Sequence, residues 1–270
     1  EVRRSASATD LATTAGVLVH QDSFYHHIRV FEEGEARYMD FDNLRQSAVT
    51  IADPSDLRLA YTRTILLGLA FRPAAREVLL IGLGGGSIPR RLHRDIPDLR
   101  IDAVEIDPTV IQAAERFFYL RPDDRLRVHA VDGRLFVLRP GRSYDLAFLD
   151  AYNSDTIPFH LATREFYREL KQRLAPGGAI VSNIIGALAG PRSRLLRAMV
   201  KTIQAEFPQV YLLPVGLRPR RDRREERRRR ERRWTAASSP SSAASRSSPS
   251  ATRATPSFFY GPAISACASS

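Results

Sequence analysis

A run of glycines directly after a short apolar segment limits the folds open to this chain more than any other feature. Residues 78–81 have the length and residue types of a buried strand, glycines follow at 82, 84, 85 and 86, and helical spacing starts near Ile88. Glycine lets the backbone turn sharply and lets a ligand approach without a Cβ in the way. A strand, a glycine turn and a helix in this order indicate a nucleotide-type ligand, although tight strand–helix corners also select glycine.

The glycine turn opens a segment, residues 77–215, in which apolar strands alternate with helices. Strands are expected at 78–81, 101–105, 126–131, 146–149, 179–185 and 210–215, and helices at 88–94, 109–118, 164–174 and 193–207. Such alternation gives a mainly parallel sheet with helices on both faces. Pro176-Gly177-Gly178 are expected to end a helix and lead into the next strand. The segment is therefore predicted to be a doubly wound, Rossmann-like α/β domain.

Two segments of different composition flank this domain. Residues 16–49 alternate polar and apolar in short runs, which predicts antiparallel strands with a hairpin, and a helix is expected at about 57–70. Residues 217–270 hold 13 Arg and four acidic residues, so most of the net charge of +11 belongs to this tail. We expect a flexible N-terminus (1–15), an antiparallel β domain (16–56), the α/β domain (57–216) and a disordered basic tail (217–270).

Composition also narrows the functions open to the chain. The single cysteine, Cys267, excludes a disulfide scaffold and a cysteine-based zinc site, and no metal site is expected. No apolar run reaches the roughly 18 residues of a membrane span, and the first residues lack a signal peptide's apolar region, so we expect a cytoplasmic protein without membrane contact. Residues 218–233 lack interleaved aromatic residues, which favours a solvated tail over a nucleic-acid or anionic-lipid arm.

The spacing of the glycines indicates which nucleotide would bind. A dinucleotide fingerprint needs glycine at the sixth position counted from Gly82, and that position is Ser87. Gly82, Gly84 and Gly86 instead form G-x-G-x-G, the pattern of Rossmann-like domains that bind S-adenosylmethionine and related compounds.

Three carboxylates stand at the ends of the expected strands. Glu105 can accept hydrogen bonds from both ribose hydroxyls, and Asp132, before Gly133, can accept one from an adenine amino group. Asp150 ends the fourth strand, where an acid can hold a cationic amine and take its proton. Simpler interpretations are a solvated strand-end acid at 105, a turn-forming Asp-Gly at 132 and a capping or loop Asp at 150. Together with the glycines, the first two predict an adenosyl site.

Over about residues 16–215 the sequence resembles the spermidine synthase (polyamine aminopropyltransferase) family, which has a Rossmann-like fold of the methyltransferase type. Ser-Phe-Tyr-His-His-Ile at 23–28 and Asp-Asn-Leu-Arg-Gln-Ser at 42–47 look like two family motifs. The glycine loop, Val-Glu-Ile-Asp at 104–107, Asp132-Gly133 and the strand ending at Asp150 follow in the family order. The resemblance implies transfer of an aminopropyl group from decarboxylated S-adenosylmethionine to a putrescine-like amine, release of methylthioadenosine, and a homodimer.

The resemblance also implies roles for single residues. Asp150 would be the base that deprotonates the amine, and Glu105 would hold the ribose. Asp132 and Gly133 would hold the adenine, and Gln46 would line the donor pocket beside the three loop glycines. Tyr61 and Asp155 would lie at the amine.

Three positions depart from the family pattern. Gly85 stands where the family has an Asp that holds the donor amine, Arg63 stands where it has a Glu, and His26 replaces a Gln. Two lost carboxylates weaken the expectation of a dicationic acceptor, because each cation needs a paired acid. A methyltransferase that uses intact S-adenosylmethionine, a catalytically silent relative and a basic-tailed binding protein therefore stay open as alternatives.

The resemblance calls for an apolar seventh strand, inserted beside the fifth after the strand at 210–215. An Arg-rich run follows instead, and unpaired charges cannot enter a buried sheet without a large cost. We therefore expect the seventh strand to be missing or poorly replaced by residues 257–260, so that the fifth strand keeps unpaired backbone groups on one side.

Overall fold

The computed structural model describes residues 16–42, 44–152, 156–215 and 263–269. The strands are β1 (Val17–Asp22), β2 (His27–Glu33), β3 (Ala36–Phe41), β4 (Leu44–Thr50), β5 (Glu77–Ile81), β6 (Arg100–Glu105), β7 (Leu126–Ala130), β8 (Tyr144–Leu149), β9 (Leu174–Ile185), β10 (Gln209–Pro214) and β11 (Ala263–Ser269). The helices are α2 (Ala60–Ile65), α3 (Ser87–Asp95), α4 (Pro108–Phe117), α5 (Gly133–Leu138), α6 (Arg164–Gln172) and α7 (Arg194–Gln204), with 3₁₀ helices η1 (Leu66–Phe71), η2 (Phe159–Leu161) and η3 (Pro191–Ser193).

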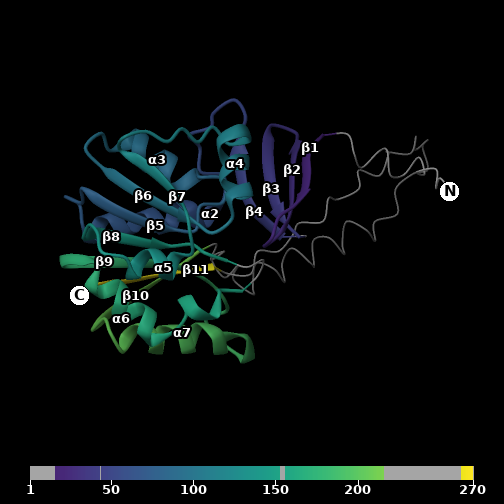
Figure 1. Cartoon of the computed structure of the whole chain (residues 1–270). Coiled ribbons are helices and arrows are strands. Elements are labelled where there is room, and N and C mark those ends of the chain that lie inside the picture. The colour runs from purple at the N-terminus through teal and green to yellow at the C-terminus, as the bar shows by residue number, and fades with distance from the viewer. Residues whose placement is uncertain (1–15, 43, 153–155, 216–262, 270) are drawn as a thin grey trace, which may run out of the picture. The chain divides into compact units, whose positions relative to one another are not determined.

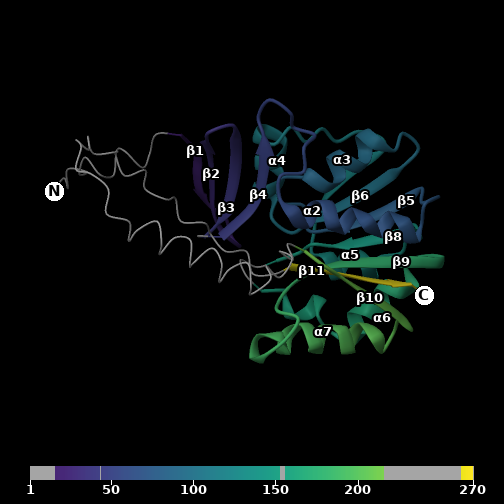
Figure 2. The ribbon, with the colours of Figure 1, turned by 180° about the vertical axis from the view of Figure 1, so that it is seen from behind.

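Seven strands form the main sheet, in the order β10-β11-β9-β8-β5-β6-β7. The five strands from β9 to β7 are parallel, and β11 runs antiparallel to both of its neighbours. Helices α5, α6 and α7 lie on one side of the sheet, and α2, α3 and α4 lie on the other (Figures 1 and 2). Buried apolar side chains of the two groups of helices belong to two separate core clusters. The doubly wound α/β fold predicted from the alternating pattern is confirmed. No helix among the described residues is long and apolar enough to cross a membrane.

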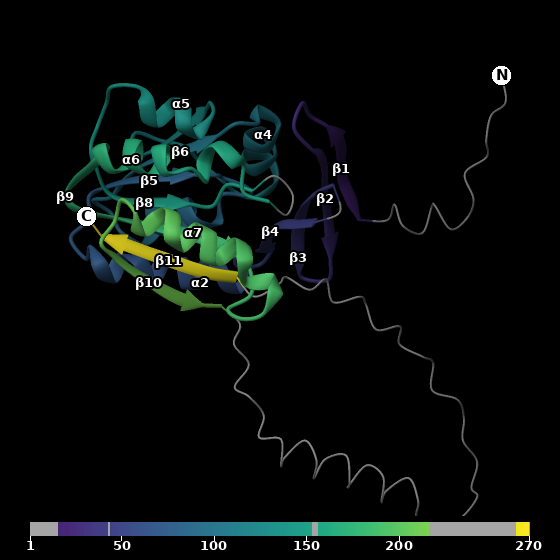
Figure 3. The same cartoon turned by 90° about the horizontal axis from the view of Figure 1, so that it is seen from below.

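The expectation of a missing seventh strand is wrong. β11 lies between β9 and β10 in the sheet, and Figure 3 shows it beside β10. Cys267 pairs with Val181 of β9 on one side and with Tyr211 of β10 on the other. The side chain of Cys267 is fully buried. A strand of small uncharged residues carries little hydrophobic signal, so the end of the expected disordered tail is in fact part of the sheet. The Arg-rich run and residues 257–260 lie outside the described residues.

The N-terminal segment forms a second, four-stranded antiparallel sheet in the order β1-β2-β3-β4. Its buried side chains, such as Ile28 and Met39, join a cluster with Val110 and Phe118 of the α4 region. The sheet therefore packs on the α/β domain, and both sheets belong to one compact unit with β11. The helix expected at 57–70 appears as α2 followed by the 3₁₀ helix η1.

Two further details differ from the sequence pattern. β9 starts at Leu174, so Pro176-Gly177-Gly178 lie inside a strand and produce an irregularity in its pairing with β8. Gly177 has φ +69°, which allows the local kink without steric strain. α5 was not expected, because Asp132-Gly133 was interpreted as an adenine-binding acid or as a turn, and not as the start of a helix.

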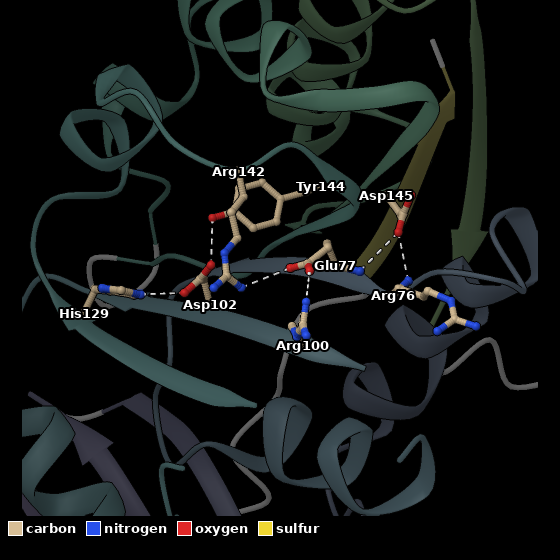
Figure 4. A network of polar contacts seen from close by, with 8 residues as sticks. All are labelled: Arg76, Glu77, Arg100, Asp102, His129, Arg142, Tyr144 and Asp145. Atoms are coloured by element: carbon tan, nitrogen blue, oxygen red, sulfur yellow. Dashed lines mark hydrogen bonds and ion pairs between the residues drawn. The ribbon is translucent and has the colours of Figure 1, made fainter. Parts of the chain in front are cut away.

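Polar side chains tie together the amino-terminal ends of the parallel strands (Figure 4). The carboxylate of Asp145 accepts two backbone N–H groups at the start of β5, at 2.8 and 3.1 Å. Buried Asp102 of β6 accepts a hydrogen bond from the Tyr144 hydroxyl at 2.9 Å and pairs with His129 at 2.7 Å. Since β5 lies between β8 and β6, the Tyr144 contact spans a whole strand and helps to fix the order of the strands.

Candidate active site

The glycine turn follows β5 and lies against the backbone at the end of β8. Gly82 has φ +92°, and a Cβ there would lie 2.3 Å from the carbonyl oxygen of Asp150. Gly84 and Gly86 also have positive φ, at +52° and +69°. Only glycine fits Gly82, because both the conformation and the close approach exclude a side chain. The sequence therefore brings the candidate base next to the candidate nucleotide loop.

Strand β4 of the small sheet reaches the same loop. The hydroxyl of Ser47 accepts a hydrogen bond from the N–H of Gly85 at 2.7 Å. Gln46 is the extra residue of a β-bulge, because Met39 pairs with Ser47 whereas the next residue of β3 pairs with Arg45. A bulge changes the direction of a side chain relative to a regular strand. The backbone oxygen of Gln46 lies 4.0 Å from the position that a Cβ of Gly84 would take. The Gln46 backbone thus lies next to the loop, and the role of its side chain in the donor pocket stays a prediction.

Gly85, which replaces a family Asp, lies in a crowded position. A Cβ there would lie 2.9 Å from a ring carbon of Phe118 and 2.9 Å from the Cβ of Ser47. A side chain at this position would require both neighbours to move, so the loop is built around the glycine.

Glu105 ends β6 directly beneath the loop and is almost fully buried. Its two carboxylate oxygens accept the N–H groups of Leu83 and Asp107, at 3.0 and 3.2 Å. Burial raises the pKa of Glu105, while these hydrogen bonds act in the opposite direction. The carboxylate is thus fixed by the backbone of the glycine loop itself.

Asp132 lies at the end of β7 and caps α5. Its Oδ1 accepts the N–H of Leu135 at 2.9 Å, and its Oδ2 lies 2.8 Å from His160 Nε2. Gly133 follows, and a Cβ there would lie 2.5 Å from a side-chain carbon of Ile81. Asp132 thus caps a helix that the sequence did not predict, and its other carboxylate oxygen faces a side chain from another segment.

Asp150 is held by two side chains, one on each oxygen. The Tyr61 hydroxyl donates to Oδ2 at 3.1 Å, and the Asn183 amide donates to Oδ1 at 2.9 Å. Burial raises the pKa of Asp150 to about 7, the two hydrogen bonds oppose the rise, and the charge of Glu105 adds to it. An acid with a pKa near neutrality can both release and accept a proton under physiological conditions.

The chain after Asp150 is tied to β9 by Tyr152. Its hydroxyl donates to the carbonyl of Asn183 at 2.8 Å and accepts the N–H of Ile185 at 2.8 Å. Asn183 itself is buried, and its Oδ1 receives no hydrogen bond from the described residues. A small pocket lined mostly by apolar side chains, among them Leu149 and Ala151, reaches Asn183 from the side of α6.

The other positions singled out from the sequence lie in different surroundings. Arg63 turns away from Asp150: it donates to the carbonyl of Leu57 at 2.6 Å and lies 3.6 Å from Asp56. His26 is buried and stacks on Phe41, with ring centroids 4.3 Å apart. Asp155 lies outside the described residues, and no three His, Cys, Asp or Glu side chains within the described ranges gather as a metal site would require.

Sequence analysis missed Asn183 and His160 entirely. Each reaches a predicted carboxylate from a segment more than 25 residues away in the chain, so no local spacing signals the contact. An amide near the end of a central strand and a histidine after Pro158 were the only available hints.

Comparisons with known proteins identify the family of this chain. Residues 58–212 match the model of the spermine/spermidine synthase domain. A polyamine aminopropyltransferase of Vibrio vulnificus is 42% identical over 175 residues, which are 62% of this chain and 58% of that protein, so the chain spans less than two thirds of this relative.

Spermidine synthase from Thermotoga maritima superposes with a TM-score of 0.65 at 17% identity, covering 94% of this chain and 72% of that one. Human methyltransferase-like protein 13, in complex with SAH, superposes with a TM-score of 0.53 at 25% identity, covering 59% of this chain and 78% of that one. The family model alone matches more than half of the sequence, and the chain therefore belongs to the spermine/spermidine synthase family.

Proposed function

We propose that the protein transfers an aminopropyl group from decarboxylated S-adenosylmethionine to an amine and releases methylthioadenosine. The observation that carries the proposal is Asp150, an acid with a pKa of about 7 that lies against the glycine loop between two hydrogen-bond donors. Membership of the family and the named activity of the Vibrio relative support the same reaction.

The residues at the carboxyl ends of the strands fit an adenosyl donor. The turn is made of glycines, so it presents backbone and no side chains to a ligand. Gly84 and Gly86 have positive φ, and Gly82 is closely packed, so each position favours glycine. Glu105 is buried and fixed by the loop, and its remaining lone pairs can accept the ribose hydroxyls. Asp132 can accept from the adenine amino group, with Gly133 beside it, and Gln46 lines the donor pocket from β4.

Asp150 supplies the proton chemistry of the proposed reaction. The donor's sulfonium is already an activated leaving group. The amine nitrogen forms a bond to the carbon next to sulfur, the carbon–sulfur bond breaks, and the proton lost by the nitrogen passes to Asp150. Tyr61 and Asn183 hold the carboxyl in one orientation, and the buried Asn183 Oδ1 can accept a second N–H of the amine. Holding the amine in line with the donor then accounts for most of the rate.

A putrescine-like diamine is the acceptor that the family suggests. Its first nitrogen would lie at Asp150 and Tyr61, and Asp155 stays the predicted partner of its second cation. The homodimer and the cytoplasmic location expected from the sequence likewise stay predictions.

A second candidate function is methyl transfer from intact S-adenosylmethionine. Gly85 favours it, since the crowding by Phe118 and Ser47 leaves no room for the carboxylate that would hold the donor amine in the family pattern. The human structure that resembles this chain is a methyltransferase-like protein in complex with SAH.

Mass spectrometry of reaction products tests the first candidate. The purified chain is incubated with decarboxylated S-adenosylmethionine and a panel of mono-, di- and polyamines. We expect an aminopropylated amine in at least one reaction of the wild type and none in the same reaction with Asp150→Asn. A binding preference above tenfold for the intact over the decarboxylated donor would instead favour methyl transfer.

A further inference from the structure

Among the residues that the structure describes, His160 is the one whose side chain hydrogen-bonds to the carboxylate of Asp132. Its Nε2 lies 2.8 Å from Oδ2 of Asp132, while Oδ1 of the same carboxylate accepts the N–H of Leu135. Asp132 is 19% exposed and His160 is 31% exposed, so the contact is partly shielded from water. A partly shielded, charge-assisted hydrogen bond holds its geometry better than an exposed one.

The position of His160 follows from the path of the chain after the candidate base. The chain leaves Asp150 at the end of β8 and returns through Pro158 to the 3₁₀ helix η2, which contacts both α5 and α6. His160 thereby belongs to the same connection as the base, although it pairs with the acid that caps α5. A second contact, the bidentate pair between Arg134 and Glu169 with both distances at 2.7 Å, fastens α5 to α6, and Arg134 also donates to the backbone carbonyl of His160 at 3.5 Å.

Two donors on two different oxygens fix the plane of the Asp132 carboxylate. A carboxylate offers about four lone-pair positions, so Leu135 and His160 leave others for a ligand. A carboxylate that is already oriented loses less conformational entropy when a ligand binds to it. A hydrogen bond from a neighbouring residue that does not touch the ligand can therefore increase the affinity for that ligand. His160 must carry its proton on Nε2 to donate, as it does in one neutral tautomer and in the charged ring.

We propose that His160 is a positioning residue of the adenosyl site, which orients Asp132 to accept the amino group of adenine. The inference rests on the proposed adenosyl donor and deepens it, because it assigns the recognition of the adenine amino group to a pair of residues on separate segments.

Calorimetric titration of the full chain with two ligands tests the inference. Methylthioadenosine carries the adenine amino group, and its purine analogue without that group does not. His160→Ala is expected to weaken methylthioadenosine binding by about 3- to 10-fold and to leave the analogue within about 2-fold, as loss of one hydrogen bond predicts. His160→Gln keeps an N–H donor and is expected to recover most of the loss.

Two controls separate positioning from a general structural role. His93→Ala removes the histidine of a different histidine–aspartate pair, the one with Asp123, and both ligands should bind this variant as they bind the wild type. In an Asp132→Ala background, His160→Ala should have no further effect, because the two residues act as one unit. Equal weakening of both ligands by His160→Ala, or no weakening of either, would overturn the inference.

Binding of the two ligands to the wild type distinguishes a failure of the adenosyl site from a failure of the role of His160. Binding of both ligands with equal affinity would leave an adenosyl site in place and refute the role of His160 and Asp132. Binding of neither ligand would refute the adenosyl donor and the positioning role together.

Discussion

The side-chain amide of Asn183 donates to the carboxyl of Asp150 at 2.9 Å, so a residue of β9 holds the acid that ends β8. Tyr61, from helix α2, donates to the other oxygen at 3.1 Å. These contacts stabilise the ionised form, yet burial is the larger effect and leaves the pKa at about 7. The candidate base is therefore balanced between its two protonation states at neutral pH.

Asp150→Asn is expected to abolish transfer and to stabilise the fold at high pH. The folded-state pKa of Asp150 is above its usual value of 3.8, so its contribution to stability is fully present below pH 3.8 and is lost as the pH rises to about 7. The neutral amide escapes this loss, which amounts to about 1.4 kcal/mol per pH unit in that window. Thermal unfolding at pH 4 and pH 8 measures it: the Tm difference between variant and wild type should grow with pH, and an unchanged difference would refute the shifted pKa.

Tyr61→Phe is expected to move the acid limb of the pH–rate profile to higher pH. Loss of the hydroxyl removes a hydrogen bond that favours the ionised carboxylate, so the pKa of Asp150 rises further. Steady-state kcat/KM measured across pH 5 to 9 gives the position of the limb. Tyr211→Phe on β10 is the matched control and should leave it in place; an unshifted limb in Tyr61→Phe would show that Asp150 is not the group that titrates.

Gly85→Asp, which introduces the family carboxylate, is expected to destabilise the protein and to fail to improve amine binding. The new Cβ would lie 2.9 Å from both Phe118 and Ser47, and overpacking of this kind costs about 1 to 3 kcal/mol. Gly85→Ala carries the same crowding without the charge and should lose a similar amount in chemical denaturation. A Gly85→Asp variant as stable as the wild type would show that the loop has room for a side chain.

Cys267→Asp is expected to disrupt the end of the main sheet. The side chain lies fully buried on β11 between β9 and β10, and an unpaired charge there costs several kcal/mol, about 3 or more. Cys267→Ala removes one sulfur atom and should cost about 1 kcal/mol. Equal midpoints for the two variants in denaturant would contradict the assignment of residues 263–269 to the sheet.

Much of the fold could be predicted because its signals are local. The apolar runs at β5, β6 and β8 and the glycines after β5 are readable within ten residues, and so are Glu105, Asp132 and Asp150 at the strand ends. β11 was missed because its pairing partners on both neighbouring strands lie at least 50 residues earlier in the chain and because it contains mostly small residues.

The contacts that tune the candidate site were not readable in the same way. Asn183 meets Asp150, and His160 meets Asp132, only because the parallel register and the path through η2 bring separate segments together. The crowding at Gly85 depends equally on Phe118, which lies after α4 and far from the loop in sequence. The chemical types were visible in the sequence, but their pairing is a property of the packed structure.

Aminopropyl transfer is tested most directly by identifying the nucleoside that the purified protein releases. The purified chain is supplied with an amine and, in separate reactions, with decarboxylated or intact S-adenosylmethionine. The nucleoside products are then separated and identified by mass spectrometry. Methylthioadenosine from the decarboxylated donor, dependent on the amine and absent with Asp150→Asn, is the predicted result. S-adenosylhomocysteine from the intact donor, with no methylthioadenosine from the decarboxylated one, would contradict it.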